Sequence, residues 1–174
     1  MRPGIRSIES STRNRGTAVP LFLGPVFVVL AAFVILVYQR FIPAHDSGTV
    51  LQRQANDCGP AALTMVLNHF GILEHPDDVR RVFQLSQEGA SVSEMIRVAG
   101  FYGLKASGWR LSFSALKTDR FPLVILVDGD HFVVVDSVQS ERLYVRDPAK
   151  GRGVIMQSDL ANRWEGTSLR FATD

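Results

Sequence analysis

Hydrophobic and polar positions divide the chain into one long apolar run near the N-terminus and a series of shorter, patterned segments after it. No charged residue occurs between Arg15 and Arg40, and the run from Ala18 to Tyr38 is 21 residues of almost uniform apolar character. A helix of that length is about what a hydrocarbon core of ~30 Å requires. The run therefore predicts one transmembrane helix over residues 18–38.

Two other interpretations of this run stay open, a cleaved signal peptide and a buried core helix. A signal peptide usually has a shorter apolar stretch, about 7–15 residues, followed by small residues at a cleavage site. Here the run continues into Tyr38-Gln39-Arg40-Phe41, which is a poor cleavage environment. A helix that is hydrophobic on all sides must also be wrapped by apolar surface, and the remaining chain offers little. The pattern favours an uncleaved anchor.

The arginines predict the orientation of this anchor. Four of them precede the apolar run and one follows it closely. Positive residues favour the cytoplasmic side of a span, so we expect a cytoplasmic N-terminus and a domain beyond the bacterial cytoplasmic membrane, facing the periplasm or the outer surface. The expected parts are a basic segment over 1–17, the anchor over 18–38, a polar linker over 39–48 and one folded domain over 49–174.

In the domain, helical patterns come first and strand patterns follow. A helix is expected from Pro60, with Asp57 as its N-cap and Gly71 as its stop. Two more are expected over 76–83 and from Ser91, where Ser91 and Glu94 have capping-box spacing. Strands are expected at Lys105–Leu111, Leu123–Val127, His131–Asp136, Leu143–Asp147, Val154–Gln157 and Thr167–Phe171. Helices followed by strands predict an α+β domain with an antiparallel sheet.

Composition and charge exclude several classes of partner and cofactor. After residue 40 the chain has 14 basic and 16 acidic residues and no basic patch with interleaved aromatic residues, which argues against nucleic acid. The four histidines are scattered without the spacing of a metal site, and one cysteine rules out an intrachain disulfide. We expect no cofactor.

The single cysteine, Cys58, is a candidate nucleophile. It lies at the start of the first predicted helix, beside Gly59, which leaves the backbone near the sulfur open. The partial positive charge of a helix N-terminus favours a thiolate. The alternative is a small, inert core residue, and position alone does not decide between the two.

His131 and Asp147 are candidates for the general base and the residue that orients it. They flank two predicted strands, and a hairpin centred on Gln139 would place them directly opposite each other, with Cβ atoms about 4.5–5.5 Å apart. A carboxylate at that distance can hold one imidazole nitrogen and leave the other for a thiol. The alternative is an ordinary strand histidine and an Asp-Pro strand terminator.

Chemistry on an acyl group also needs donors for the developing oxyanion. The backbone N–H of Cys58 is one candidate, and a side-chain amide shortly upstream is another. Both Gln52 and Gln54 are available, and spacing does not choose between them.

These residues occur in an order that resembles the C39 peptidase family. The blocks are Leu51–Gly71, which contains Gln52, Asp57 and Cys58; His131–Val135; Asp147-Pro148; and Leu160–Gly166, which contains Trp164. The resemblance implies a papain-like cysteine peptidase with Cys58 as nucleophile, His131 as base, Asp147 orienting the histidine and Gln52 at the oxyanion.

The resemblance also implies a substrate class and a cellular context. Its best-known members remove double-glycine leaders as domains of bacteriocin exporters, so a peptide or protein substrate with a Gly-Gly leader and a link to export machinery are expected. Since no transporter domain or ATP-binding cassette follows residue 174, we expect a stand-alone, membrane-anchored member. Two alternatives to a leader peptidase stay open. One is another thiol acyl-transfer or amidase reaction on an envelope substrate, and the other is a non-catalytic peptide-binding module.

Overall fold

The computed structural model describes residues 48–173. The basic segment over 1–17, the anchor over 18–38 and all but the last residue of the linker over 39–48 lie outside the described residues. Within residues 48–173, no helix has both the length and the apolar character that crossing a membrane requires.

Three helices open the domain, as the sequence predicts. They are α2 (Cys58–His69), α3 (Pro76–Val82) and α4 (Val92–Phe101). Helix α2 starts two residues before the predicted start and ends ahead of Gly71, whose φ of +79° suits a glycine stop. At α4, Ser91 Oγ accepts from the Glu94 N–H at 3.1 Å, but the Glu94 carboxylate accepts from the Gln84 N–H, so only half of the capping box forms.

A six-stranded antiparallel sheet follows, with strand order β1-β6-β2-β3-β4-β5. Its strands are β1 (Lys105–Arg110), β2 (Leu123–Val127), β3 (His131–Gln139), β4 (Arg142–Asp147), β5 (Gly151–Met156) and β6 (Thr167–Ala172). All six were predicted, so the α+β class is confirmed. Two short helices, α5 (Phe113–Lys117) and α6 (Gln157–Leu160), were missed because four or five residues are too few to show a helical period.

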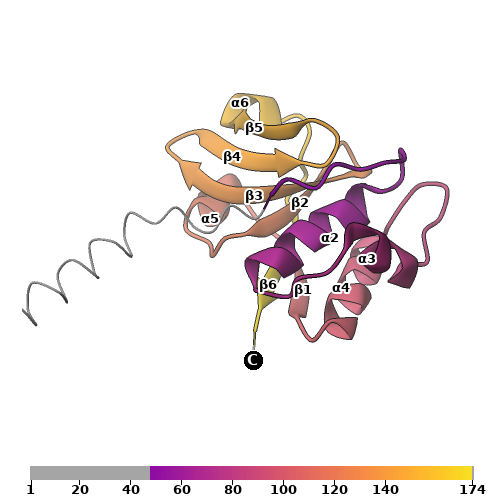
Figure 1. Cartoon of the computed structure of the whole chain (residues 1–174). Helices are drawn as coiled ribbons and strands as arrows, with labels where there is room; N and C mark the ends of the chain where they lie inside the picture. The colour runs from indigo at the N-terminus through magenta and orange to yellow at the C-terminus, as the bar shows by residue number, and fades with distance from the viewer. Residues whose placement is uncertain (1–47, 174) are drawn as a thin grey trace, which may run out of the picture. The chain divides into compact units, whose positions relative to one another are not determined.

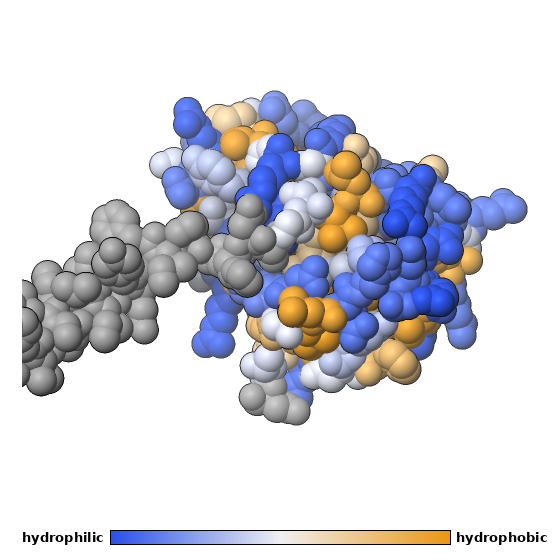
Figure 2. All heavy atoms as spheres, viewed as in Figure 1, coloured by the Kyte–Doolittle hydropathy of each residue, from blue (hydrophilic) through white to orange (hydrophobic). Residues whose placement is uncertain are grey.

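Both faces of the sheet are covered (Figure 1). Val124, Phe132 and Leu169 face the side packed by α2, α3 and α4. Leu123 and Ile125 face the other side, where buried leucines of α5 and α6 complete a second cluster. The viewed surface is largely hydrophilic, with apolar patches separated from one another (Figure 2). The start of α2 therefore lies against the sheet that carries His131 and Asp147.

The β3–β4 hairpin has a different register from the predicted one. Its turn is Ser140-Glu141, with Gln139 paired to Arg142, and a bulge between Val135 and Ser137 shifts the ladder so that Val134 pairs with Arg146. Continuing that register sets Asp147 across from Val133, so direct opposition to His131 was wrong. The two residues are diagonal neighbours on one face, a separation that long side chains can bridge.

Candidate active site

Cys58 is the first residue of α2 and its side chain is buried, with only 3% of the residue exposed. Its Sγ lies 3.7 Å from the carbonyl oxygen of Asp130, which ends the turn between β2 and β3. The thiol is thereby placed between the helix start and the first residue of β3, His131. This is the position that the sequence predicts for a helix-terminal thiol.

His131 and Asp147 are joined by a hydrogen bond of 2.8 Å between Nε2 and Oδ1. The same carboxylate oxygen accepts from the Ala149 N–H at 2.8 Å, and the Asp147 side chain is 9% exposed. A carboxylate fixed in this way holds the imidazole in one orientation and leaves Nδ1 for another partner. The proximity expected from the sequence is therefore present, although by a diagonal rather than a direct pairing.

Cys58 and Asp147 both act on the charge of His131. The Cys58 side chain makes the largest contribution and raises the pKa of His131 above its ordinary value; burial lowers the pKa, and Asp147 raises it further. The thiol thus has two neighbours that can accept from it: the Asp130 carbonyl and an imidazole, which can take its proton. Such a thiol, imidazole and carboxylate can support nucleophilic attack on an acyl group.

Gln52 and Gln54 differ in their surroundings. The Gln52 backbone N–H donates to the Pro148 carbonyl at 2.9 Å, which fixes this residue next to Asp147. Its side-chain Nε2 donates to the carbonyls of Gln54 and Ala55 at 3.1 and 3.4 Å, and its Oε1 is buried without a partner among the described residues. Gln54 is exposed, and its Oε1 accepts from Arg80. Of the two, Gln52 is thus the one tied to the site, although its amide N–H groups face their own loop.

Asp57 occupies the N-cap position of α2 but does not cap the helix, which corrects the sequence-based expectation. Its Oδ1 accepts from Arg80 Nε at 2.6 Å and its Oδ2 from the Gln54 N–H at 3.2 Å. The ion pair with α3 outcompetes the cap because a charged donor makes the stronger hydrogen bond. The sequence analysis did not identify Arg80 as a partner of this site. The only signal was an acidic residue directly before Cys58 together with a basic residue on the next helix.

A second pair that the sequence did not indicate holds the turn before His131. Arg163 Nε donates to both carboxylate oxygens of Asp128, at 2.9 and 3.1 Å, and the Asp128 N–H donates to the Arg163 carbonyl at 2.7 Å. Asp128 has φ +56°, so this turn has a backbone conformation that few side chains favour. The segment after α6 therefore fixes the turn that carries the Asp130 carbonyl.

A cavity of about 540 Å³ lies beside this turn. It is lined by residues of the loop before α4 and of β2 and β3, among them Gly89, Ala90, Leu126, Asp130 and Phe132. Because Asp130 belongs both to this cavity and to the contact with Cys58, the cavity adjoins the thiol. It offers a place for part of a bound chain.

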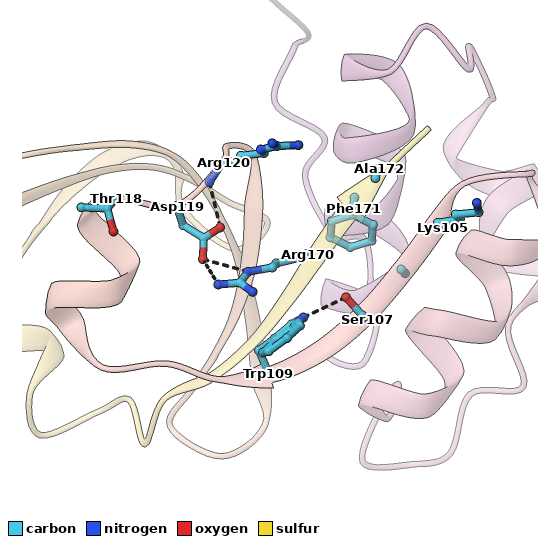
Figure 3. Close-up of a pocket in the computed structure, with 10 residues that line it drawn as sticks. Lys105, Ser107, Trp109, Thr118, Asp119, Arg120, Arg170, Phe171 and Ala172 are labelled. Carbon is cyan, nitrogen blue, oxygen red and sulfur yellow. Dashed lines mark hydrogen bonds and ion pairs between the residues drawn. The ribbon is translucent and has the colours of Figure 1, made fainter. Parts of the chain in front are cut away.

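A larger cavity, about 650 Å³, lies elsewhere, over β1 and β6. Figure 3 shows Arg170 between the Asp119 carboxylate and the Trp109 ring. The guanidinium lies 4.3 Å from the ring centre, and Trp109 Nε1 donates to Ser107 Oγ at 2.9 Å. None of the four candidate site residues lines this cavity. We assign the chemistry to the smaller cavity, because its Asp130 contacts the Cys58 thiol and directly precedes His131.

Comparison with known proteins gives one family. The model of the peptidase C39 family matches residues 46–174. The chain is 30% identical over 132 residues to the colicin V secretion/processing ATP-binding protein of Escherichia coli, covering 76% of this chain and 18% of that protein. It is 29% identical over 133 residues to a probable functional amyloid protease of Pseudomonas aeruginosa, covering 67% of this chain and 57% of that protein.

Solved structures give the same fold. A double glycine motif protease from an AMS/PCAT transporter, in complex with its leader peptide, superposes with a TM-score of 0.69 at 31% identity, covering 72% of this chain and 91% of that one. The peptidase domain of Streptococcus ComA also superposes with a TM-score of 0.69, at 19% identity, covering 74% of this chain and 99% of that one. The chain matches such peptidase domains along nearly their whole length.

Proposed function

The chain belongs to the peptidase C39 family and is a cysteine peptidase, and on this premise we propose that it cuts a leader or segment from an exported peptide or protein after small residues such as Gly-Gly. The observation that carries the proposal is the 2.8 Å bond between His131 and Asp147 beside the buried Cys58 at the start of α2. The relative with 31% identity, a double glycine motif protease bound to a leader peptide, supports the substrate class.

In the proposed mechanism the Cys58 thiol gives its proton to His131 and the thiolate attacks the scissile carbonyl. The imidazolium then protonates the leaving amine, so the C–N bond breaks and a thioester remains on Cys58. A water molecule, deprotonated by His131, attacks the thioester and releases the acid and the thiol. Asp147 keeps the imidazole oriented and favours its charged form, in agreement with the raised pKa of His131.

The proposed oxyanion donors are the backbone N–H of Cys58 and the side-chain amide of Gln52. The Gln52 amide donates to the carbonyls of Gln54 and Ala55, so it must exchange these acceptors for the substrate oxygen. Its anchored backbone beside Pro148 supports this role, since only the side chain has to turn. A donor of this kind contributes on the order of 10²–10³ in kcat.

We further propose that the peptidase is held at the bacterial cytoplasmic membrane by the apolar run over residues 18–38, with its domain on the far side. The four arginines before the run and the single one after it support this orientation. A peptidase in this place would meet its substrate during or after export. The chain spans 18% of the length of the colicin V secretion/processing protein, and an export machinery is the proposed partner.

The proposed function is tested by peptide cleavage with the purified full chain in detergent. The substrates are a peptide with Gly-Gly before the cut and a matched peptide with phenylalanine in place of the second glycine. We expect cleavage of the first and a loss on the order of 10²-fold in kcat/KM for the second, because a bulky side chain displaces the carbonyl from its donors. Cys58→Ala should abolish cleavage of both.

Two outcomes would separate the parts of the proposal. Equal rates on both peptides would contradict Gly-Gly specificity and leave the peptidase intact. Cleavage that survives Cys58→Ala would remove Cys58 as the nucleophile.

A further inference from the structure

The first turn of α2 has only two free backbone donors. The N–H groups of Cys58 and Gly59 have no hydrogen-bond partner within residues 48–173, Pro60 has no N–H, and the Ala61 N–H already donates to the Asp57 carbonyl at 3.1 Å. These two groups are next to the thiol. An anion at this helix start, whether thiolate or oxyanion, depends on them.

The side chain most able to occupy these donors is Asp57. An aspartate at the N-cap position usually accepts from the second or third N–H of its helix, and here only the second, that of Gly59, is available. Asp57 has ψ 5° instead of the extended backbone of a capping residue, and its carboxylate is turned to Arg80 and the Gln54 N–H. The Asp57 carboxylate, which would otherwise compete for the Gly59 N–H, is thus held away from the helix N-terminus.

Arg80 holds this arrangement from α3. Its Nε donates to Asp57 Oδ1 at 2.6 Å and its Nη2 donates to Gln54 Oε1 at 2.9 Å. One guanidinium therefore binds both the first and the last residue of the segment 54–57 before Cys58. The Asp57 side chain is 6% exposed and that of Arg80 is 37% exposed, which places the ion pair at the edge of the domain interior. There the pair is weakly screened and the carboxylate has a defined direction.

We propose that Arg80 is a positioning residue that keeps the Asp57 carboxylate off the N-terminus of α2, so that the N–H groups of Cys58 and Gly59 stay available to the thiolate and to the oxyanion. This inference rests on the proposed function. Without Arg80, the Asp57 carboxylate caps the Gly59 N–H. It then competes with the oxyanion and adds a negative charge beside the sulfur.

The other charged groups that face the thiol do not give this effect. The Cys58 side chain raises the pKa of His131 on β3, and Asp147 on β4 acts through His131. The turn between β2 and β3 presents the Asp130 carbonyl, which has no net charge. Arg80 on α3 can affect the thiol only indirectly, by way of its hydrogen bonds to Asp57 and Gln54. Its removal therefore changes the first turn and leaves the histidine pair in place.

The test measures alkylation of Cys58 by iodoacetamide against pH in the full chain, where this residue is the sole cysteine. Arg80→Met should move the midpoint of the alkylation rate to higher pH. It should also lower kcat on the Gly-Gly peptide on the order of 10²-fold with a smaller change in KM. Arg81→Met is the matched control, because the neighbouring Arg81 pairs with Asp78 on the exposed side of α3.

The decisive variant is Arg80→Met combined with Asp57→Ala, which removes the competing carboxylate. We expect the midpoint and kcat to return toward the wild-type values, whereas a merely structural role of Arg80 predicts no recovery. If Arg80→Met does not fold, Asp57→Ala alone is informative, since the midpoint of its alkylation rate should lie at no higher pH than that of the wild type.

Two results would overturn the proposal. One is an alkylation midpoint at higher pH in Asp57→Ala than in the wild type. The other is an unchanged midpoint in Arg80→Met.

Alkylation needs no substrate, so this test is independent of the proposed specificity. A wild-type chain that cleaves neither peptide but shows the expected alkylation profiles would contradict the proposed function alone.

Discussion

At the scale of single residues, His131 connects the helical part of the domain to the sheet. Its Nε2 is hydrogen-bonded at 2.8 Å to the Asp147 carboxylate of β4, and Cys58 of α2 raises its pKa. Both neighbours raise the pKa of His131, and burial alone opposes them. The histidine contributes most to stability in its charged form. That contribution is complete below the ordinary pKa and is lost as the pH rises through the raised one.

Asp147→Asn removes the carboxylate charge and keeps the shape of the side chain. The pKa of His131 should fall, since one of the two groups that raise it is gone, and the alkaline limb of the pH profile of kcat/KM should move to lower pH. The measurement is kcat/KM from pH 5 to 10 for both chains. An alkaline limb at the same pH in both would show that Asp147 does not tune the histidine.

Single residues are also where the sequence was most informative. Cys58, His131 and Asp147 were proposed from their types and positions, and the structure brings all three together. Asp57 was expected to cap α2 and instead binds Arg80, because a guanidinium far along the chain competes for the same carboxylate. Local preference describes what a side chain can do, but the partner that wins depends on tertiary contacts.

At the scale of elements, the turn between β2 and β3 sets where His131 begins. The Asp128–Arg163 pair and the backbone bond between the same residues fix this turn to the segment after α6. Arg163→Met removes the ion pair and leaves the backbone bond. Since both side chains are partly exposed, the free energy of unfolding should fall by only about 0.2–1 kcal/mol.

The effect on catalysis should be larger than the effect on stability. A small shift of the turn moves His131 and the Asp130 carbonyl relative to Cys58, so we expect kcat/KM to fall on the order of 10-fold or more in Arg163→Met. Thermal unfolding and Gly-Gly peptide cleavage measure the two effects. Arg110→Met is the control, because Arg110 pairs with Glu165 at 3.4 Å between exposed side chains. Equal activity of the two variants would contradict a positioning role for this turn.

Elements were predicted well where their pattern is long and poorly where a single residue changes the geometry. The strand over Leu123–Val127 was predicted at its observed bounds, since it is apolar throughout and ends at turn residues. The β3–β4 register was wrong by two residues, because a bulge at Asp136 and a two-residue turn are compatible with the same alternation. Period-2 patterning fixes which face a residue joins, and it does not fix its partner.

At the scale of the whole molecule, the proposed topology has one membrane crossing and an external domain. A reporter fused after Asp174 that works only outside the cytoplasm should be active, and the purified protein should retain Met1 or its neighbour as N-terminus. Reversing the charge bias by replacing Arg13 and Arg15 with glutamate should reduce the external fraction. A mature N-terminus near His45 would show cleavage in place of anchoring.

The lone thiol has a consequence for oxidation. Cys58 is the only cysteine in the chain, so a sulfenic acid formed on it finds no second thiol in the chain to resolve it as a disulfide. The 3% exposure of this residue restricts attack to small oxidants such as peroxide. In an oxidising compartment the enzyme therefore has no intrachain disulfide in which the sulfur could be stored reversibly. Each oxidised molecule stays inactive until an external reductant reaches the sulfur.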